Sequence, residues 1–375
     1  MIGDIEIMKT IVISGINFFE GGPLSVYKDC LDNIIKNRLN ETNKIIAFVH
    51  RKELFAEYAD KISIIELPKS RKSYLYRLWY EYIYFYFYSK DKNIDVWLSL
   101  HDITPNVKAT KRYVYCHNPS PFMKTEFSNL KYSYKNFLFS LFYKYLYKIN
   151  IKKNTAVIVQ QDWMRHEFIK MYKLKSVIVA RPMVNVSKAV DINISKKHND
   201  KYQFIYPSFP RFFKNFESIC MACELLETKG VTGYEVLLTI DGNENRYSKY
   251  LKKRFGKLLS VKFIGLQKRK SLFNLYGTVD CMIFPSKLET WGLPISEFKV
   301  TGKPMLVSDL DYAHETVGTY DKVVFFNPNE PEELANFMEK AIIGILYYKS
   351  VKEICVKQPY AENWKILLDM INAEN

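Results

Sequence analysis

The sequence predicts an α/β protein of two domains, each built on a parallel β-sheet with helices on both faces. Short apolar runs rich in Val, Ile, Leu and Tyr alternate with amphipathic helical patterns along almost the whole chain. Strands that are buried on both faces form near-continuous apolar runs, and helices are the usual connections between parallel strands. The polar stretch at 186–201 divides the runs into two sets, and a length of 375 residues favours two domains over one.

The first set predicts an N-terminal domain over residues 1–185. Its strand-like runs lie at 9–16, 44–50, 62–68, 95–101, 112–117, 155–160 and 176–182. The first run leads into a loop with Gly21 and Gly22 and then into a helical pattern. Pro23 stands in the first turn of that pattern, a position that suits proline because its missing N–H would have no partner there.

The second set predicts a C-terminal domain over residues 200–350. Its strand-like runs lie at 202–208, 234–241, 261–266, 281–285, 303–309 and 322–328, with helical patterns between them, for example at 217–229, 245–258 and 332–346. The two sets predict two Rossmann-like domains that face one another. Because ligands bind at the carboxyl ends of parallel strands, we expect the active site in the cleft between the domains.

Composition narrows the class of protein. The chain is 48% hydrophobic and 25% charged, which is typical of a globular protein. No stretch has the pattern of a signal peptide, and the aromatic run at 78–88 is too short and too rich in tyrosine to span a bilayer. We therefore expect a cytoplasmic protein that begins at Met1 or Met8. Cys220 and Cys223 lie in a helical pattern with no second pair nearby, so we expect buried, reduced thiols.

The formal net charge of +15 indicates an anionic partner. The segment 131–153 concentrates this charge, with six lysines, no acid and many aromatic residues at roughly helical spacing. Two interpretations stay open. The segment is either a helix lying peripherally on anionic membrane, where each lysine contributes about 1 kcal/mol, or a core helix with a solvated basic face. Nucleic acid is disfavoured as a partner because no nucleic-acid-binding motif accompanies the charge.

Two regions have the features of a diphosphate site. The loop with Gly21 and Gly22 leaves backbone N–H groups open to a ligand at the start of a helix, although a purely structural turn explains this pair equally well. Arg211 and Lys214 follow a strand and precede a helix. Cations are disfavoured at the start of a helix, so two of them there suggest an anion between them.

The stretch PSKLETWGLPISEF, residues 285–298, contains two glutamates eight positions apart. Glu289 follows a strand, Gly292 marks the start of a new helix, and Glu297 lies in its first turns. At about 1.5 Å per helical residue and about 3.5 Å per extended residue, the carboxylates can lie on the order of 10–15 Å apart. That span fits a nucleotide-sugar held at its hexose and at its ribose. The N–H groups expected at the diphosphate between them are those of Trp291, Gly292 and Leu293.

These residues resemble the retaining glycosyltransferases of family four, which have the GT-B fold. The resemblance covers most of the chain and is strongest over 202–316, where Glu289 and Glu297 match the family's Glu-x7-Glu element. It implies that Glu289 contacts the donor sugar near its anomeric carbon and that Glu297 holds the ribose. It further implies transfer of a sugar from a nucleotide-diphosphate donor to an acceptor hydroxyl, with retention of configuration, in surface polysaccharide or glycolipid assembly.

The resemblance also assigns roles to other residues. Arg211 and Lys214 are similar to the pair that holds the donor diphosphate, although their spacing is shorter than in many members. Gly21 and Gly22 match the glycine loop that faces the donor phosphates, and His117 matches the histidine beside the reacting sugar. The weaker candidates in other loops are His101, Asp102, Glu244 and Asn245.

The implied chemistry requires no cofactor and no metal. We expect front-side attack by the acceptor hydroxyl, with the leaving diphosphate helping to take its proton and with Glu289, His117 and Lys214 as the catalytic residues. Asp309-Leu310-Asp311 has the form of a metal-binding D-x-D motif, but it ends a strand after the glutamate pair, and we interpret its acids as loop residues.

The acceptor, a saccharide or a lipid-linked saccharide, is expected on the first domain. By the same resemblance the final helix, at about 355–375, crosses back to that domain. Other classes stay open: an oxidoreductase of the Rossmann type, a sugar epimerase or phosphorylase, and a basic nucleic-acid-binding module. The oxidoreductase lacks its glycine fingerprint here, and in the nucleic-acid-binding module the paired glutamates would repel phosphate.

Overall fold

The computed structural model describes residues 8–122, 142–182, 200–349, 351 and 354–373, and these form two compact units. Unit 1 contains the described residues 8–122, 142–182 and 356–373. Unit 2 contains those from 200 to 355. The polar stretch at 186–201 lies almost wholly outside the described residues.

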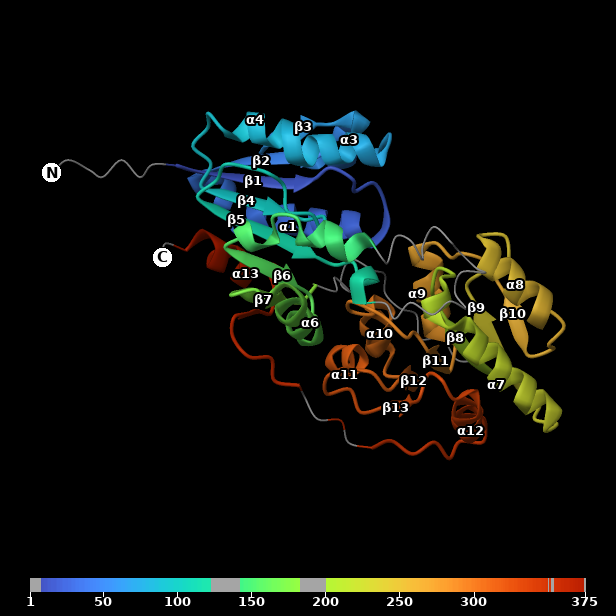
Figure 1. Ribbon diagram of the computed structural model, residues 1–375. Helices are drawn as coiled ribbons and strands as arrows, with labels where there is room; N and C mark the ends of the chain where they lie inside the picture. The colour runs from blue at the N-terminus through green and yellow to red at the C-terminus, as the bar shows by residue number, and fades with distance from the viewer. Residues whose placement is uncertain (1–7, 123–141, 183–199, 350, 352–353, 374–375) are drawn as a thin grey trace. The chain divides into compact units, whose positions relative to one another are not determined.

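Unit 1 is built on a parallel sheet with the strand order β14-β7-β6-β5-β4-β1-β2-β3 (Figure 1). Its strands are β1 (Lys9–Gly15), β2 (Asn43–Val49), β3 (Ser63–Glu66), β4 (Val96–Ser99), β5 (Lys111–Cys116), β6 (Ala156–Val159), β7 (Val177–Ala180) and β14 (Tyr360–Ala361). Its helices are α1 (Gly21–Lys36), α2 (Leu39–Thr42), α3 (Tyr74–Trp79), a π-helical segment (Tyr80–Tyr84), α4 (Phe85–Ser89), a helix at 142–148, α6 (Asp162–Tyr172) and α13 (Trp364–Asn372).

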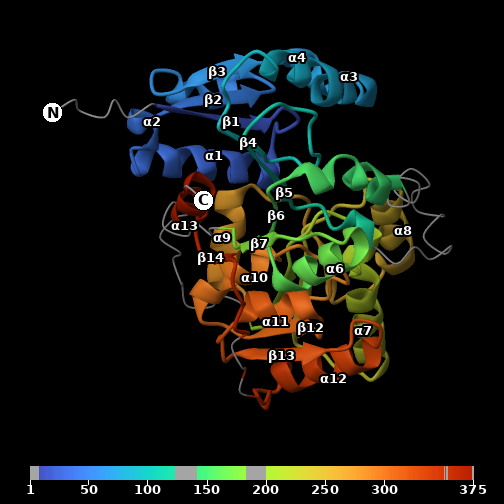
Figure 2. The same cartoon turned by 60° about the vertical axis from the view of Figure 1, so that its left-hand side comes forward.

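Helices cover both faces of this sheet because each strand presents apolar side chains to both faces. On one face, the stripe of α1 that contains Tyr27, Leu31 and Ile34 packs on the strands. On the other face, α3, the π-helical segment and α4 bury Tyr80 and Phe85 against the sheet. Figures 1 and 2 show these helices on opposite sides of the strands. The sheet is therefore doubly wound, as the sequence predicts.

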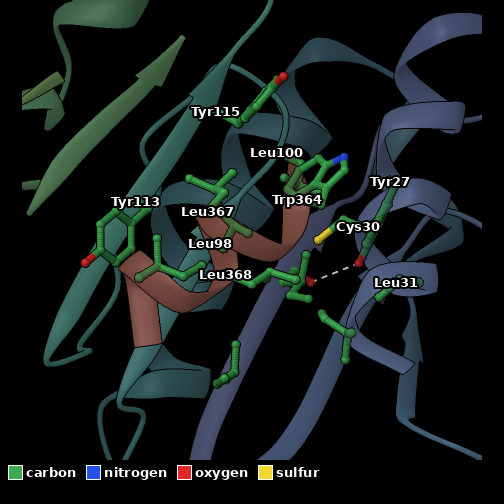
Figure 3. Close-up of a cluster of buried hydrophobic side chains, with 14 of the residues drawn as sticks. Tyr27, Cys30, Leu31, Leu98, Leu100, Tyr113, Tyr115, Trp364, Leu367 and Leu368 are labelled. Atoms are coloured by element: carbon green, nitrogen blue, oxygen red, sulfur yellow. Dashed lines mark hydrogen bonds between the residues drawn. The ribbon is translucent and has the colours of Figure 1, made fainter. Parts of the chain in front are cut away.

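The C-terminal segment completes unit 1. Strand β14 pairs with β7 in parallel register, and the Arg165 guanidinium donates to the Lys357 carbonyl oxygen at 2.8 Å. Helix α13 then lies beside α1, and Figure 3 shows Trp364 and Leu367 between the side chains of α1 and those of β4 and β5. The Trp364 ring stacks on Tyr115 with a centroid distance of 5.7 Å. The end of the chain is thus part of the core of unit 1.

Unit 2 is built on a second parallel sheet with the strand order β10-β9-β8-β11-β12-β13. Its strands are β8 (Tyr202–Tyr206), β9 (Tyr234–Leu238), β10 (Val261–Phe263), β11 (Cys281–Phe284), β12 (Met305–Ser308) and β13 (Val323–Phe326). Its α-helices are α7 (Phe216–Thr228), α8 (Arg246–Phe255), α9 (Arg269–Thr278), α10 (Leu293–Phe298), α11 (Asp311–Val317) and α12 (Pro331–Ile342).

The structure confirms each strand that the sequence predicts and corrects one helix. The pattern at 131–153 predicts a continuous helix. Of its described part, only 142–148 is helical, because Asn150 takes a left-handed conformation with φ of 58° and a short 3-10 turn follows. Residues 131–141 lie outside the described residues. The expected thiol pair is confirmed: Cys220 and Cys223 are buried on α7 and form no disulfide.

Candidate functional site

In unit 2, Lys214 and Glu289 lie together at the carboxyl edge of the sheet. Strands β8 and β11 are hydrogen-bonded neighbours, so the loops that leave their carboxyl ends run side by side. The Lys214 Nζ lies 2.5 Å from Glu289 Oε1, and the side chains are only 18% and 12% exposed. Asn215 fixes the two loops, because its side-chain amide donates to the Pro285 carbonyl oxygen at 3.1 Å. A cation and a carboxylate are therefore held in one place by the fold.

Arg211 stands beside this pair without an acid of its own. Its guanidinium is 6.0 Å from the centroid of the Phe213 ring, and the Lys214 ammonium is 5.7 Å from the same centroid. In the described part of the chain, no carboxylate oxygen lies within 4 Å of Arg211. The structure thus brings the two predicted cations to one aromatic ring, with Lys214 paired to Glu289 and Arg211 open to an anion.

Glu297 has a different cationic partner, Arg269, which the sequence analysis missed. Arg269 begins α9, and its guanidinium lies 3.2 Å from the Glu297 carboxylate on α10. The Glu297 side chain is 12% exposed. Burial raises the pKa of this carboxyl group, and Arg269 partly opposes the rise. No local pattern could have found Arg269, because it lies 28 positions away on another helix.

The turn between the two glutamates is set by Gly292, whose φ of 85° favours glycine. Trp291 before it is buried, and its indole N–H donates to the Ser296 hydroxyl at 2.9 Å. Among the described residues, no hydrogen-bond acceptor is found for the backbone N–H groups of Gly292 and Leu293. The fold therefore does not use these two amides in its described part.

In unit 1, Asp102 holds His117 in place at the end of β5. Asp102 has a φ of 70°, and its Oδ1 accepts hydrogen bonds from the backbone N–H groups of His117 (2.8 Å) and Asn118 (3.1 Å). The Tyr147 hydroxyl donates to the same oxygen at 2.8 Å. The His117 Nε2 is 3.7 Å from Asp102 Oδ2. Burial lowers the pKa of His117 and the Asp102 charge opposes this, so the ring is neutral at neutral pH.

His101 lies deeper than a ligand-binding residue would. It is fully buried and bonds through Nε2 to the carboxylate of Glu81, which is fully buried as well. Arg77 donates to the His101 carbonyl oxygen at 2.9 Å. These contacts attach the helical segment at 74–89 to the loop after β4. The ring of His101 supports the fold and is closed to a ligand in this structure.

A pocket of about 140 Å³ opens in unit 1 where the β1–α1 loop, the end of β5 and the turn after β3 meet. Its lining residues are Asn17, Phe18, Phe19, Glu20, Pro23, Arg71 and His117. Gly21 and Gly22 begin α1 directly after the lining residue Glu20, and a Cβ built on either would meet nothing within 4 Å. The structure thus brings His117 to the loop that precedes the glycine pair.

Other predicted candidates have local structural roles. The Glu244 carboxylate accepts from the backbone N–H groups of Asp241 and Gly242, and Asn245 forms a capping box at the start of α8. Asp309 pairs at 2.6 Å with His314 of the following helix, α11, so this acid of the D-x-D segment already has a local partner. In the part of the chain that the structure describes, no three His, Cys, Asp or Glu side chains are grouped as a metal site would need.

Comparison with known proteins connects this geometry to a family. Residues 187–350 match the family described as "Glycosyl transferases group 1". Both ion pairs, Lys214–Glu289 and Arg269–Glu297, lie within the matched residues. The serotype-specific mannosyltransferase WbdA of Escherichia coli is 27% identical over 154 residues. These are 40% of this chain and 19% of WbdA, so the chain spans about a fifth of that relative.

Solved structures extend the likeness to both units. A glycosyltransferase from Rickettsia africae ESF-5 aligns with a TM-score of 0.64 and 16% identity, over 90% of this chain and 89% of that one. Anabaena Alr3699/HepE, solved in complex with UDP and glucose, aligns with a TM-score of 0.59 and 15% identity, over 96% and 95% of the two chains. The chain has the GT-B fold. None of its described helices is both long enough and apolar enough to cross a membrane.

Proposed function

We propose that this GT-B protein is a retaining glycosyltransferase that moves a sugar from a nucleotide-diphosphate donor to an acceptor hydroxyl. The observation that carries the proposal is the contact of Lys214 with Glu289 at the carboxyl edge of the unit 2 sheet. Ligands of parallel α/β sheets bind at that edge. A lysine there can neutralise a leaving diphosphate, and a carboxylate beside it can contact the sugar that the diphosphate releases.

The donor would lie along the residues that the second sheet presents. Glu297 would accept hydrogen bonds from the ribose hydroxyls, and the amides of Gly292 and Leu293 would donate to the diphosphate together with Lys214 and Arg211. Trp291 is proposed to fix this turn through its indole and its burial. The free protein pairs both glutamates with cations, which keeps the two carboxylates in position before the donor arrives.

Unit 1 would supply the acceptor side. His117 is neutral and fixed by Asp102, so its ring can exchange hydrogen bonds with a sugar hydroxyl without carrying charge. Front-side attack, in which the departing diphosphate takes the acceptor proton, uses no second carboxylate near the anomeric carbon. The roles of Gly21 and Gly22 at the donor phosphates, and independence from metal ions and cofactors, stay predictions.

The named relatives support the class of substrate. WbdA is a mannosyltransferase by name, and HepE was solved with UDP and glucose. They favour a nucleotide-sugar donor and a saccharide acceptor in surface polysaccharide assembly. They do not favour an oxidoreductase, a sugar epimerase or a nucleic-acid-binding module.

We further propose that the acceptor is lipid-linked and that unit 1 contacts anionic membrane. The segment 74–89 presents a row of exposed apolar side chains, with Leu75 78%, Trp79 45%, Ile83 47% and Phe87 59% exposed. Its two charged residues, Arg77 and Glu81, both point inward and are buried. Lysines flank it: Lys72 before it, and Lys90 and Lys92 after it, with Asp91 between the last two. An apolar helix face with cations at its ends suits the surface of an anionic bilayer.

Release of nucleoside diphosphate from a panel of nucleotide-sugars, with bacterial lipid extract as acceptor, tests the enzymatic proposal. Lys214→Gln should lower kcat by about 100-fold or more with the best donor, because one charge-stabilising group is lost at the leaving diphosphate. Lys229→Gln is the matched control, since Lys229 forms an exposed pair with Glu339 in the same unit. Equal rates for the two variants would contradict the role of Lys214.

A further inference from the structure

We propose that the pocket of unit 1 is an oxyanion-binding subsite, in which Arg71 binds a phosphate or carboxylate carried by a saccharide. Nothing in the family match covers this pocket, because the matched residues begin at 187. The proposal rests on the proposed glycosyltransferase function for the nature of the ligand, and it adds that the saccharide in this pocket is acidic.

The pocket lies where the topology of the sheet favours a ligand. From β1 the chain winds outward through β2 to β3 and then returns to β4 on the other side of β1. The carboxyl ends of β1 and β4 therefore border the point at which the winding reverses, and parallel α/β sheets bind ligands at that point. Asn17–Glu20 follow β1, and His117 follows β5, the neighbour of β4.

Arg71 is presented to this pocket by an aromatic ring. Its guanidinium lies 4.6 Å from the centroid of Phe19, and both residues line the pocket. Among the described residues, no carboxylate lies within 4 Å of Arg71, whereas neighbouring Arg51 is 3.9 Å from Glu53. A guanidinium that is stacked on a ring keeps its N–H groups free in its own plane, where they bind oxyanions in a bidentate manner.

Two residues that line the pocket with Arg71 each have a buried polar atom without a hydrogen-bond partner. The Oδ1 of Asn17 and the Nδ1 of His117 are buried and have no hydrogen-bond partner in the structure. Asn17 and His117 bring polar side chains to the wall of the pocket, and such side chains can exchange hydrogen bonds with sugar hydroxyl groups. Glu20 also lines the pocket and can accept a hydroxyl hydrogen bond. Polar side chains that share a pocket with one guanidinium, itself without a carboxylate partner, match a sugar that carries a phosphate or carboxylate.

The oxyanion has two chemical sources, the donor diphosphate and an anionic group of the acceptor. The test uses the full chain and nuclear magnetic resonance titrations at low salt. The probes are α-D-glucose 1-phosphate and D-glucuronate as acidic sugars, methyl α-D-glucoside as the neutral sugar, and UDP as the donor fragment. The variants are Arg71→Gln and, as a matched control, Arg51→Gln. Arg51 is also near Phe19, at 6.0 Å, but does not line the pocket.

We expect the wild-type protein to bind the acidic sugars about tenfold more tightly than the neutral sugar, as one charge-assisted contact implies. Arg71→Gln should remove this preference, and Arg51→Gln should keep it. If Arg71→Gln leaves UDP affinity unchanged, the oxyanion belongs to the acceptor; if UDP affinity falls as well, it belongs to the donor. Absence of any preference for acidic sugars, or an equal loss in both variants, would overturn the proposal. Failure of the proposed function would appear separately, because the wild-type protein would then not bind UDP.

Discussion

At the scale of single residues, function and stability oppose one another at Glu297. Its pKa is raised by burial, so over the range between its usual value and the raised value the folded protein binds more protons than the unfolded chain. The free energy of unfolding therefore falls as the pH rises through that range, and the penalty is fully present above the raised pKa. A buried acid that weakens the free protein is consistent with a role in binding.

The loss of stability caused by the buried Glu297 charge leads to a prediction for Glu297→Gln. The variant should have a free energy of unfolding at pH 7 equal to or above that of the wild type, since the lost pair with the exposed Arg269 contributes little. Its donor affinity should fall at the same time. Urea denaturation at pH 5 and pH 7 measures the first effect, and the difference between wild type and variant should grow with pH. A variant that is less stable by more than about 1 kcal/mol at pH 7 would contradict this account.

Asp102 positions His117, and the charge of its carboxylate raises the pKa of the His117 ring. In Asp102→Asn the carboxylate charge is lost, so the pKa of His117 should fall further below its usual value. Tyr147→Phe is the matched control, because it removes one hydrogen bond to Asp102 and keeps the charge. Proton NMR of the histidine ring against pH measures both. A purely structural Asp102 would give two variants with the same His117 titration midpoint.

At the scale of elements, the segment 74–89 tests the proposed contact with membrane. Changing both Leu75 and Trp79 to Ser should weaken binding to phosphatidylglycerol vesicles by at least about tenfold, because each apolar side chain buried from water contributes about 1.5–3 kcal/mol. Leu259→Ser is the control, since Leu259 is 81% exposed in unit 2. Vesicle flotation at low salt provides the measurement. Equal flotation of the two variants would exclude this face as the membrane contact.

The elements were largely predictable, whereas the contacts of the site were not. Residues 45–49 of β2 and all of β11 (Cys281–Phe284) are apolar on both faces of their sheets, and such apolar runs can be recognised in the sequence alone. Glu289 and Glu297 could be found because they lie near a glycine turn. Arg269 and Arg71 could not, because each meets its site through strand order and helix packing.

Some predicted candidates were explained by local structure. Asn245 and Glu244 stand in a loop that resembles a ligand loop in sequence. Glu244 accepts from backbone N–H groups of that loop, and Asn245 caps α8 and donates to the Pro210 carbonyl oxygen. Asn and Glu serve helix caps and ligands equally well. The sequence therefore does not distinguish a capping residue from a ligand-binding residue, and the local hydrogen bonds of Glu244 and Asn245 appear only in the structure.

At the scale of the whole molecule, the C-terminal helix ties the end of the chain to unit 1. Trp364 is buried between α1 and the sheet and stacks on Tyr115 (Figure 3). Trp364→Ala should lower the free energy of unfolding of unit 1 by about 3–5 kcal/mol. Ile366→Ala, on the exposed side of the same helix, is the control and should change it little. Chemical denaturation followed by circular dichroism measures both, and a loss below about 1 kcal/mol for Trp364→Ala would contradict the packing described here.

The central claim is that unit 2 holds a nucleotide-sugar through Glu297 and Lys214. Denaturation of the full chain with and without each of a panel of nucleotide-sugars, repeated with Glu297→Ala and with the surface control Glu339→Ala, tests it most directly. We predict one preferred donor that stabilises the protein by about 2.7 kcal/mol at a hundredfold excess over Kd. We also predict that Glu297→Ala loses most of this binding while Glu339→Ala keeps it. Full donor affinity in Glu297→Ala, or no binding of any nucleotide-sugar to the wild type, would contradict the claim.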